Sequence, residues 1–482
     1  MRNLCRMWPF LLLCLLTVAG CVEEEKFPTA AGDRLTFSVD TLKMDTVIAG
    51  RTSVTRSFAV YNRNHDGVSI TNVAFANDDP DGFRVNVDGV SVGRELDESI
   101  DFRKGDSLTV FVEIRPEESG RDDKVEHRAT LVFTLANGVR QSVVLQAWGQ
   151  DVIWLKGYHA TGPDERLDAQ RPYVIEDSLT VDAGATLRLG PGVRLMFGSQ
   201  ALLRVDGRLL CEGTAERPVV LRGDRMDMMF ENQPYDRISN QWQGVVLTAS
   251  SRGSHLDHTD IHSGSWGVRI EPADDDAQEE RLRMENSVIH NVGGHCLEAT
   301  ASKLLVGNSQ ISNAGGNCVR LLGGDAQFIH CTIAQFYPFD GLRGAALRYA
   351  NADGCPLLGA MFINCVVTGY SDDEIFGEWE SETAAFNYGF QNCLLNTPEI
   401  DDDPNVLDNQ WDRTGNEVSR AGNFTGFNLD WLIYGFALDS RSLAIGAADA
   451  SVTERYYPYD RLGRPRLDDG RSDAGCYEHV DE

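Results

Sequence analysis

From Tyr173 to about residue 400, short runs of alternating apolar and polar residues follow one another, separated by glycines and polar turns. The related phrases NSVIHN, NSQISN and HCTIAQ begin at Asn286, Asn308 and His330, at intervals of 22 residues. A coil of three short strands and three turns needs about 22 residues, because a strand advances about 3.3 Å per residue. The pattern therefore predicts a solenoid of parallel strands.

The repeated phrase also predicts which side chains face the interior. Its second position holds only small residues, and its fourth position holds only Ile, Val or Leu. Side chains two positions apart in a strand share a face, so both positions are predicted to point inward. The outward neighbour Thr332 is then predicted to tolerate a charged residue. The cysteines of the second position are small core residues rather than ligands. That position contains Thr259, Ser287, Ser309, Cys331, Cys365 and Cys393.

The segment before the solenoid has a different pattern. Seven runs with period-two alternation lie between Leu35 and Asp151, and Gly, Asp and Asn turns separate them. This pattern is typical of an antiparallel β-sandwich. The predicted fold is all-β: a sandwich over residues 34–151, a parallel β-helix over 152–400 and a C-terminal cap over 401–482. A cap is expected because the end of a solenoid exposes apolar edges.

The N-terminus carries a targeting signal. Arg2 and Arg6 precede an apolar run that ends in VAGC, so residues 1–20 are predicted to be a secretory signal. The run resembles a bacterial lipoprotein signal, which implies that Cys21 is acylated and that residues 21–33 form a tether. Val22 after the cysteine, followed by EEEK, resembles the sorting signals of Bacteroidetes lipoproteins. The resemblance implies an outer-membrane, lipid-anchored protein exposed on the cell surface.

The two predicted domains resemble known modules. The phrases DTVIAGRTSVTRSFAVYN and GDSLTVFVEI are similar to immunoglobulin-like modules at the front of Bacteroidetes surface lipoproteins. The phrases YVIEDSLTVDAGATLRLGPGVRLMFGS and WQGVVLTASS resemble the opening coils of right-handed parallel β-helices of the pectate-lyase-like kind. The resemblance implies a scaffold shared with pectate lyases and polygalacturonases.

Composition and charge narrow the partners. The 482 residues are 42% apolar and 24% charged, which is normal for a soluble globular protein. The net charge of −29 becomes −31 when the two arginines of the signal are removed. So acidic a chain argues against nucleic acid and against an anionic lipid surface as partners. We therefore expect contact with the membrane only through the lipid anchor.

Loops that interrupt the 22-residue interval are the best candidates for binding, because the coil itself only repeats. One such loop lies between Leu221 and Trp242 and combines Arg, Asp and aromatic residues, which suit a sugar or the edge of a protein. The alternative is that this loop packs on the coils or on the sandwich. Its candidate binding residues are Asp224, Arg225, Asp227, Tyr235, Asp236, Arg237 and Trp242.

Carboxylates and histidines provide candidate metal sites. A loop between two later coils contains Asp372, Asp373 and Glu374, with Glu378 and Glu380 nearby, and these residues are candidate Ca²⁺ ligands. Residues 274–276 form a second acidic group. The alternative in each case is a solvated acidic loop. The fifth position of consecutive phrases holds His262 and His290, which with Asp260 would form a metal site or a pair of surface residues.

The sequence favours binding over catalysis. A lyase or glycosidase on this scaffold needs clustered carboxylates, with a basic partner in the lyase case, on one outer face. Neither acidic group has a Lys or Arg at the matching coil position. We therefore expect no catalytic residues and no cofactor other than Ca²⁺. The predicted function is that of a non-catalytic cell-envelope lipoprotein that presents a β-helix surface to a glycan or a surface protein. The alternative is a polysaccharide lyase or glycoside hydrolase acting on an acidic polysaccharide.

Overall fold

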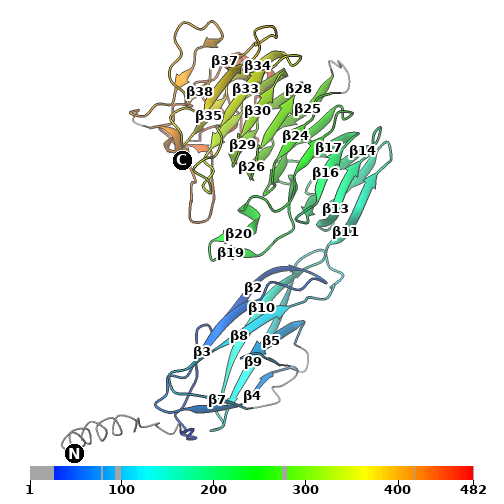
Figure 1. Ribbon diagram of the computed structural model, residues 1–482. Coiled ribbons are helices and arrows are strands. Elements are labelled where there is room, and N and C mark those ends of the chain that lie inside the picture. Colours follow the sequence, from blue (N-terminus) through cyan, green and yellow to red (C-terminus); the bar gives the residue numbers. More distant parts are fainter. Residues whose placement is uncertain (1–25, 78–79, 93–98, 274–278, 417, 481–482) are drawn as a thin grey trace, which may run out of the picture. The chain divides into compact units, whose positions relative to one another are not determined.

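The computed structural model describes residues 26–77, 80–92, 99–273, 279–416 and 418–480 (Figure 1). Cys21 and residues 274–276 lie outside these ranges. The chain divides into two compact units, Met1–Gln150 and Asp151–Glu482. The predicted all-β fold class is confirmed, since both units are built on β-sheets and the second contains large parallel sheets. No helix within the described ranges has the length and apolar character needed to cross a membrane.

The first unit is a sandwich of two five-stranded sheets. Their orders are β1-β3-β8-β5-β6 and β2-β10-β9-β4-β7, and all neighbours are antiparallel except β2 and β10. Inward and outward residues alternate as the sequence predicts, and the inward ones form one apolar core. The strands are β1 Thr36–Phe37, β2 Thr41–Ile48, β3 Arg56–Tyr61, β4 Val68–Phe75, β5 Phe83–Val87, β6 Val90–Val92, β7 Ile100–Phe102, β8 Ser107–Ile114, β9 Val125–Leu135 and β10 Arg140–Gln150.

The second unit is a parallel β-helix. Each regular coil contributes three strands, one to each of three faces. The first face contains β12 Glu165–Leu167, β14 Thr186–Leu189, β17 Arg208–Glu212, β22 Ser254–Asp257, β25 Glu280–Glu285, β28 Lys303–Gly307, β31 Gly324–Ile329, β34 Leu357–Ile363, β37 Gly389–Gln391 and β39 Val406–Leu407. The second face contains β15 Arg194–Phe197, β18 Val219–Gly223, β23 Thr259–His262, β26 Val288–Val292, β29 Gln310–Ala314, β32 Thr332–Gln335, β35 Val366–Gly369, β38 Leu394–Leu395 and β40 Gln410–Trp411. The third face contains β16 Leu202–Val205, β21 Val245–Leu247, β24 Val268–Ile270, β27 Leu297–Thr300, β30 Val319–Leu322, β33 Leu347–Asn351 and β36 Ile375–Trp379. At the N-terminal end, β11 Ile153–Ala160 pairs with β13 Tyr173–Val181, which precedes both the second and the third face.

The interior follows the predicted register. All six residues of the second repeat position are buried, from Thr259 to Cys393, and so are the aliphatic residues of the fourth position. The small column also joins successive coils. The backbone N–H of Thr259 donates to Ser287 Oγ at 2.9 Å, and the N–H of Cys331 donates to Cys365 Sγ at 3.4 Å. The described cysteines are free, and those of the second position belong to the core of the β-helix.

The backbone conformation at the first position of the repeated phrase explains why Asn and His occur there. All six residues there have left-handed backbone φ angles, between 43° and 55°. Asn adopts this conformation more readily than most residues. Side chains of the column also bond along the solenoid, as Asn308 Nδ2 does to Asn286 Oδ1 at 2.7 Å and Asn364 Nδ2 does to His330 at 3.0 Å. The repeat is thus a turn signal as well as a packing signal.

The C-terminal region departs from the prediction in two ways: the coils continue past residue 400, and the rest of the chain packs along the side of the coils. Strands β39 and β40 extend the β-helix beyond residue 400. The C-terminal segment, residues 412–480, then packs across the outer side of the second face, where Phe336 and Val366 contact Phe424 and Phe436 in one apolar cluster. The segment contains η2 Arg420–Asn423, β41 Phe424–Thr425, β42 Ala437–Leu438 and α2 Ala450–Tyr456.

This packing corrects the prediction for Thr332. Its side chain does point away from the coil interior, but the C-terminal segment covers it, and it is 2% exposed. Thr332 Oγ1 accepts a hydrogen bond from the Cys476 N–H at 3.1 Å. The buried Arg466 of the same segment donates to Asn308 Oδ1 at 2.7 Å. The repeat gave the correct face for Thr332 but not its burial.

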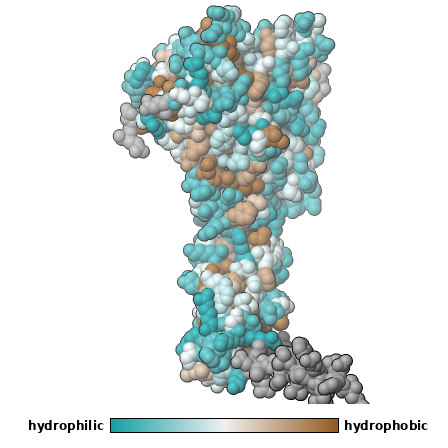
Figure 2. Space-filling model, turned by 60° about the vertical axis from the view of Figure 1, so that its left-hand side comes forward, coloured by the Kyte–Doolittle hydropathy of each residue, from teal (hydrophilic) through white to brown (hydrophobic). Residues whose placement is uncertain are grey.

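The face shown in Figure 2 is mainly hydrophilic. Figure 2 shows small, separate apolar patches on the face that it views. Exposed large apolar side chains are scattered over the chain, among them Phe230, Leu342 and Trp379. Single exposed apolar residues are normal on a soluble protein.

Candidate functional site

Two segments border the outer side of the second face and leave a pocket between them. One is the site loop, residues 224–242, which contains β19 Met228–Phe230, β20 Gln233–Pro234 and η1 Tyr235–Arg237. The other is the C-terminal segment. The pocket has a volume of about 190 Å³ and receives side chains from β26, β29 and both segments. It is lined by Arg237, Val288, His290, Asn291, Gln310, Ser312, Asn313, Leu432, Ile433 and Tyr434.

A cluster of two histidines and a carboxylate adjoins this pocket. Strands β23 and β26 pair in parallel with His262 opposite His290, and their ring centroids lie 4.8 Å apart. Asp260 Oδ1 lies 2.8 Å from His262 Nδ1 and 3.2 Å from His290 Nε2. One ligand atom from each residue lies within 4.8 Å of the others. The neighbouring positions of the two histidines match the sequence prediction.

The site loop adds a second carboxylate to the cluster. Asp236 Oδ1 lies 2.8 Å from His262 Nε2 and 2.6 Å from Arg222 Nη1. Burial opposes charge on the imidazole, but the two carboxylates outweigh it and raise the pKa of His262 to about 9. Burial also opposes charge on Asp236 and Asp260, yet the histidine charges lower the pKa of both carboxyls. Both carboxylates are therefore ionised at neutral pH.

The other candidate residues of the site loop bind one another, the coils or the C-terminal segment. Arg225 Nε donates to Asp227 Oδ1 at 2.8 Å, and the Arg225 guanidinium lies 3.6 Å from the centre of the Tyr235 ring. Arg237 Nη1 donates to the Trp431 carbonyl at 2.6 Å, which joins the loop to the C-terminal segment. The backbone N–H of Asp224 donates to the Phe197 carbonyl. Of the loop's candidate residues, Arg237 lines the pocket and Asp236 joins the histidines.

Trp242 is a core residue, contrary to its selection as a binding residue. Its side chain is fully buried and stacks on Phe197 with a centroid distance of 4.3 Å. Its indole N–H donates to the His262 carbonyl at 2.9 Å. The ring fills the coil interior just before β21, so it offers no face to a ligand.

The carboxylates of residues 372–374 do not point towards a common position. Asp372 pairs with Arg420, and Asp373 Oδ1 accepts the Ile375 N–H at 3.2 Å. Glu374 is buried and accepts the backbone N–H groups of Ser371 and Ala346 at 2.8 and 2.9 Å. Burial raises the pKa of Glu374 to about 7. The three carboxylates have separate partners, so the structure does not assemble them into one Ca²⁺ site.

Sequence reasoning missed Arg222 and Tyr434. Arg222 directly follows Leu221, which pairs with Ile261, so it occupies the position of His262 in the preceding coil. Counting outward positions along the coils would have revealed Arg222. Tyr434 lies in the C-terminal segment, where no repeat reports on position. Its hydroxyl is buried and has no hydrogen-bond partner among the described residues.

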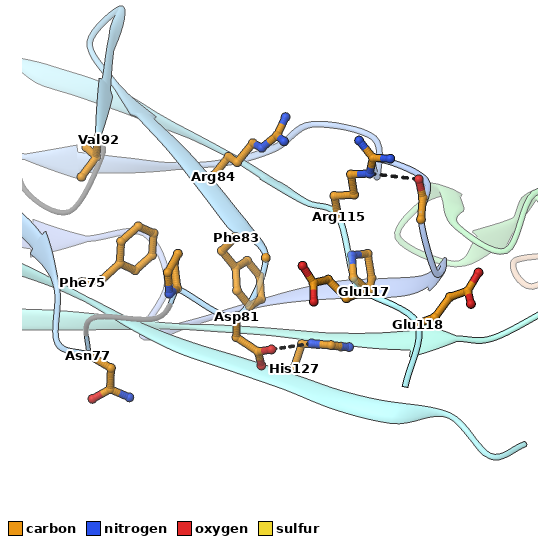
Figure 3. Close-up of a pocket in the computed structure, with 14 residues that line it drawn as sticks. Phe75, Asn77, Asp81, Phe83, Arg84, Val92, Arg115, Glu117, Glu118 and His127 are labelled. Atoms are coloured by element: carbon orange, nitrogen blue, oxygen red, sulfur yellow. Dashed lines mark hydrogen bonds and ion pairs between the residues drawn. The ribbon is translucent and has the colours of Figure 1, made fainter. Parts of the chain in front are cut away.

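The sandwich unit contains a larger open pocket of about 910 Å³ (Figure 3). Part of its charged lining is already paired, since His127 Nδ1 lies 2.7 Å from Asp81 and Arg115 Nε donates to the Gly50 carbonyl at 3.0 Å. Asn77 and Val92 line it next to residues 78–79 and 93–98, which lie outside the described ranges.

No family model matches the chain, and no curated protein matches it in sequence. Among solved structures, the Vibrio cholerae VesB protease is 17% identical, with 24% of this chain and 31% of that chain covered and a TM-score of 0.17. The chain thus spans about a third of that protease. A PapD-like domain of human CEP192 is 13% identical over 28% of this chain and 94% of that chain, with a TM-score of 0.17. The catalytic domain of a GH87 alpha-1,3-glucanase is 8% identical over 76% of this chain and 90% of that chain, with a TM-score of 0.15. Likenesses at these scores support no conclusion about fold or function.

Proposed function

We propose that the chain is a non-catalytic cell-envelope lipoprotein whose β-helix binds a glycan in the pocket between the site loop and the C-terminal segment. The observation that carries this proposal is the position of the pocket. It lies where the repeating coil meets two non-repeating segments, and Arg237 of one and Tyr434 of the other both line it. Non-repeating loops on a regular scaffold are where binding usually occurs.

The lining suits one sugar ring better than a large apolar ligand. A volume of about 190 Å³ lies below the roughly 300–1,000 Å³ of pockets for drug-sized ligands. The lining combines amides and a serine with Tyr434, an aromatic side chain with a polar tip. The Tyr434 hydroxyl has no partner within the described part of the chain, and a buried hydroxyl gains free energy when a ligand supplies one. A terminal sugar with its hydroxyl groups would supply that partner.

The electrostatics of the cluster favour binding over hydrolysis. A glycoside hydrolase of the common two-carboxylate kind needs one carboxylic acid that stays protonated to protonate the leaving oxygen. Asp236 and Asp260 are the carboxylates beside the pocket, and their histidine partners lower the pKa of both. Neither is suited to donate a proton. A glycoside hydrolase or polysaccharide lyase remains the alternative function.

The membrane anchor belongs to the same proposal. Cys21 lies outside the described residues, and the support for its acylation is the signal-like sequence before it. The residues after Cys21 then tether the sandwich and the β-helix at the outer membrane, on the cell surface. The predicted tether is shorter than residues 21–33, because the Gly67 N–H donates to the Lys26 carbonyl at 3.0 Å and Asn137 Nδ2 donates to the Ala30 carbonyl at 2.7 Å. A binding protein held there meets extracellular glycans or neighbouring surface proteins.

A glycan-array screen of the mature chain, started at Val22 so that it carries no lipid, tests the proposal. We expect a defined set of bound glycans, no cleavage products by mass spectrometry and loss of binding in Tyr434→Phe. Tyr456→Phe removes a hydroxyl from an exposed tyrosine on α2, away from the pocket lining, and should bind normally. Cleaved glycans would establish the enzymatic alternative. Equal binding by Tyr434→Phe and Tyr456→Phe would place the site elsewhere.

A further inference from the structure

We propose that Asp260, His262 and His290 bind one Zn²⁺ ion at the edge of the pocket. The three residues come from two adjacent coils, so the backbone pairing of β23 with β26 fixes their spacing. This inference deepens the proposed function, since His290 also lines the pocket. Zn²⁺ binding is measurable without any glycan, however, so the two proposals fail separately.

The distances fit a small coordination sphere. Zn²⁺ binds imidazole nitrogens at about 2.0–2.1 Å and carboxylate oxygens at about 2.0–2.2 Å, which places tetrahedral ligand atoms about 3.3 Å apart. Asp260 Oδ1 lies 2.8 Å from His262 Nδ1 and 3.2 Å from His290 Nε2. The ion replaces the protons of the two hydrogen bonds that now join the histidine nitrogens to Asp260 Oδ1. The two strands are already in register, so their pairing keeps the two histidines next to each other.

The remaining nitrogen of His262 has the partner that a metal ligand needs. Histidines that bind metals commonly donate their second ring N–H to a carboxylate, which fixes the tautomer and orients the ring. His262 Nε2 lies 2.8 Å from Asp236 Oδ1, and Arg222 Nη1 holds the same oxygen at 2.6 Å. His262 Nδ1 is therefore left to face Asp260 and the ion. Asp236 is a positioning residue in this arrangement and Arg222 holds it in place.

The ligand types select against Ca²⁺ and Mg²⁺. Those ions prefer sets made of oxygen, and Ca²⁺ takes six to eight oxygens. Two imidazoles and one carboxylate instead match the His₂-carboxylate set found at open zinc sites. Such a site leaves a fourth position for water or a ligand. Because His290 belongs to both the cluster and the pocket lining, that position is within reach of an oxygen of the bound glycan.

Equilibrium dialysis of the mature chain from Val22 against Zn²⁺, followed by metal counting, tests the proposal. We expect one ion per chain, with at least tenfold weaker binding in His290→Gln and Asp260→Asn. Asp236→Asn should weaken binding about 10- to 100-fold, as loss of an outer-shell partner does. His159→Gln is the matched control, because His159 also lies 2.8 Å from an aspartate, Asp182, but has no place in the cluster. It should bind Zn²⁺ normally.

A second measurement needs no variant. Co²⁺ in a four-coordinate site absorbs visible light strongly, whereas Co²⁺ on exposed carboxylates does not, so the unaltered chain should turn blue with one equivalent of Co²⁺. Zn²⁺ should abolish this absorption and excess Ca²⁺ should not. No bound Zn²⁺ in the unaltered chain, or His290→Gln binding as tightly as His159→Gln, would overturn the metal site. If the unaltered chain binds a glycan but no Zn²⁺, and Tyr434→Phe loses glycan binding, the metal site is wrong and the proposed function stands.

Discussion

The imidazole rings of His262 and His290 lie 4.8 Å apart, although 28 residues separate them in the sequence. Parallel pairing of β23 with β26 sets this distance, and the insertion between the two strands leaves the register unchanged. The coil thus places chemically useful side chains side by side, and the site loop adds Asp236 to them. The following predictions separate the structural residues from those that form the site.

Overpacking the small interior column should destabilise the β-helix. Cys331 is fully buried between coils, and its backbone N–H donates to Cys365 Sγ. Cys331→Trp should lower stability by about 1–3 kcal/mol, because added volume forces strain on a close-packed core. Thermal unfolding followed by far-UV circular dichroism, which reports mainly on the backbone, measures the change. A variant that melts like the unaltered chain would mean that the register is wrong.

Burial of Thr332 by the C-terminal segment can be tested on the same coil. Thr332→Lys should cost roughly 1–3 kcal/mol or more, because the lysine must be buried or must displace the segment that bonds to Thr332 Oγ1. Gln327→Lys introduces the same residue at an exposed position on the first face and should be neutral. Equal unfolding midpoints for these two variants would contradict the observed packing of the C-terminal segment.

Trp242 should matter for stability rather than for ligand contact. Its ring is buried against Phe197, so Trp242→Ala should cost about 3–5 kcal/mol. Trp379→Ala, at a position 65% exposed, should change the free energy of unfolding little. Chemical denaturation of both variants measures the difference. If Trp242→Ala kept full stability and lost only binding, the tryptophan would be a contact residue after all.

Glu374 should make the β-helix less stable as pH rises towards neutrality. Burial raises its pKa to about 7 in the folded chain, whereas an unfolded glutamate titrates near 4.3. Between these values the folded state holds a proton that the unfolded state has lost, so stability falls as pH rises through this range, by about 4 kcal/mol at most. Glu374→Gln should reduce this fall. The exposed Glu382→Gln is the control. Identical pH profiles of the unfolding midpoint in both variants would show that Glu374 does not carry the effect.

Acylation of Cys21 is tested in the intact cell. Cys21→Ser should remove metabolic labelling by fatty acid and release the protein from the membrane fraction, because the cysteine thiol is the predicted attachment point. Unchanged labelling in this variant would contradict the anchor. Surface exposure is measured separately, by protease treatment of whole cells that express the unaltered protein.

The sequence was sufficient for the coil and for part of the site. The repeated phrase predicted the inward column from Thr259 to Cys393 and the neighbouring positions of His262 and His290, because its strand pairs with itself from coil to coil even where a loop lengthens the interval. The structure argues against Asp372, Asp373 and Glu374 as one ligand set, because the three carboxylates have separate partners.

Contacts between segments distant in sequence could not be predicted in this way. Arg466 reaches Asn308 across 158 positions, and Thr332 is covered by Cys476, yet no local pattern near residue 470 reports these contacts. The pocket has the same origin, because Tyr434 meets the coil only through the fold of the C-terminal segment. The prediction for Trp242 was wrong because its aromatic type suits a binding residue, whereas its place just before β21 puts the ring in the coil interior.

The most direct test of the ligand site compares two arginines of the site loop. Arg237 lines the pocket, whereas Arg225 stacks on Tyr235 and does not line it, so alanine at either position removes the same charge from the same loop. The measurement is a calorimetric titration of both variants with the glycan that the array identifies. Arg237→Ala should bind at least tenfold more weakly than the unaltered chain, and Arg225→Ala should bind normally. Equal affinities in the two variants, or loss of binding in Arg225→Ala alone, would contradict a ligand site between the site loop and the C-terminal segment.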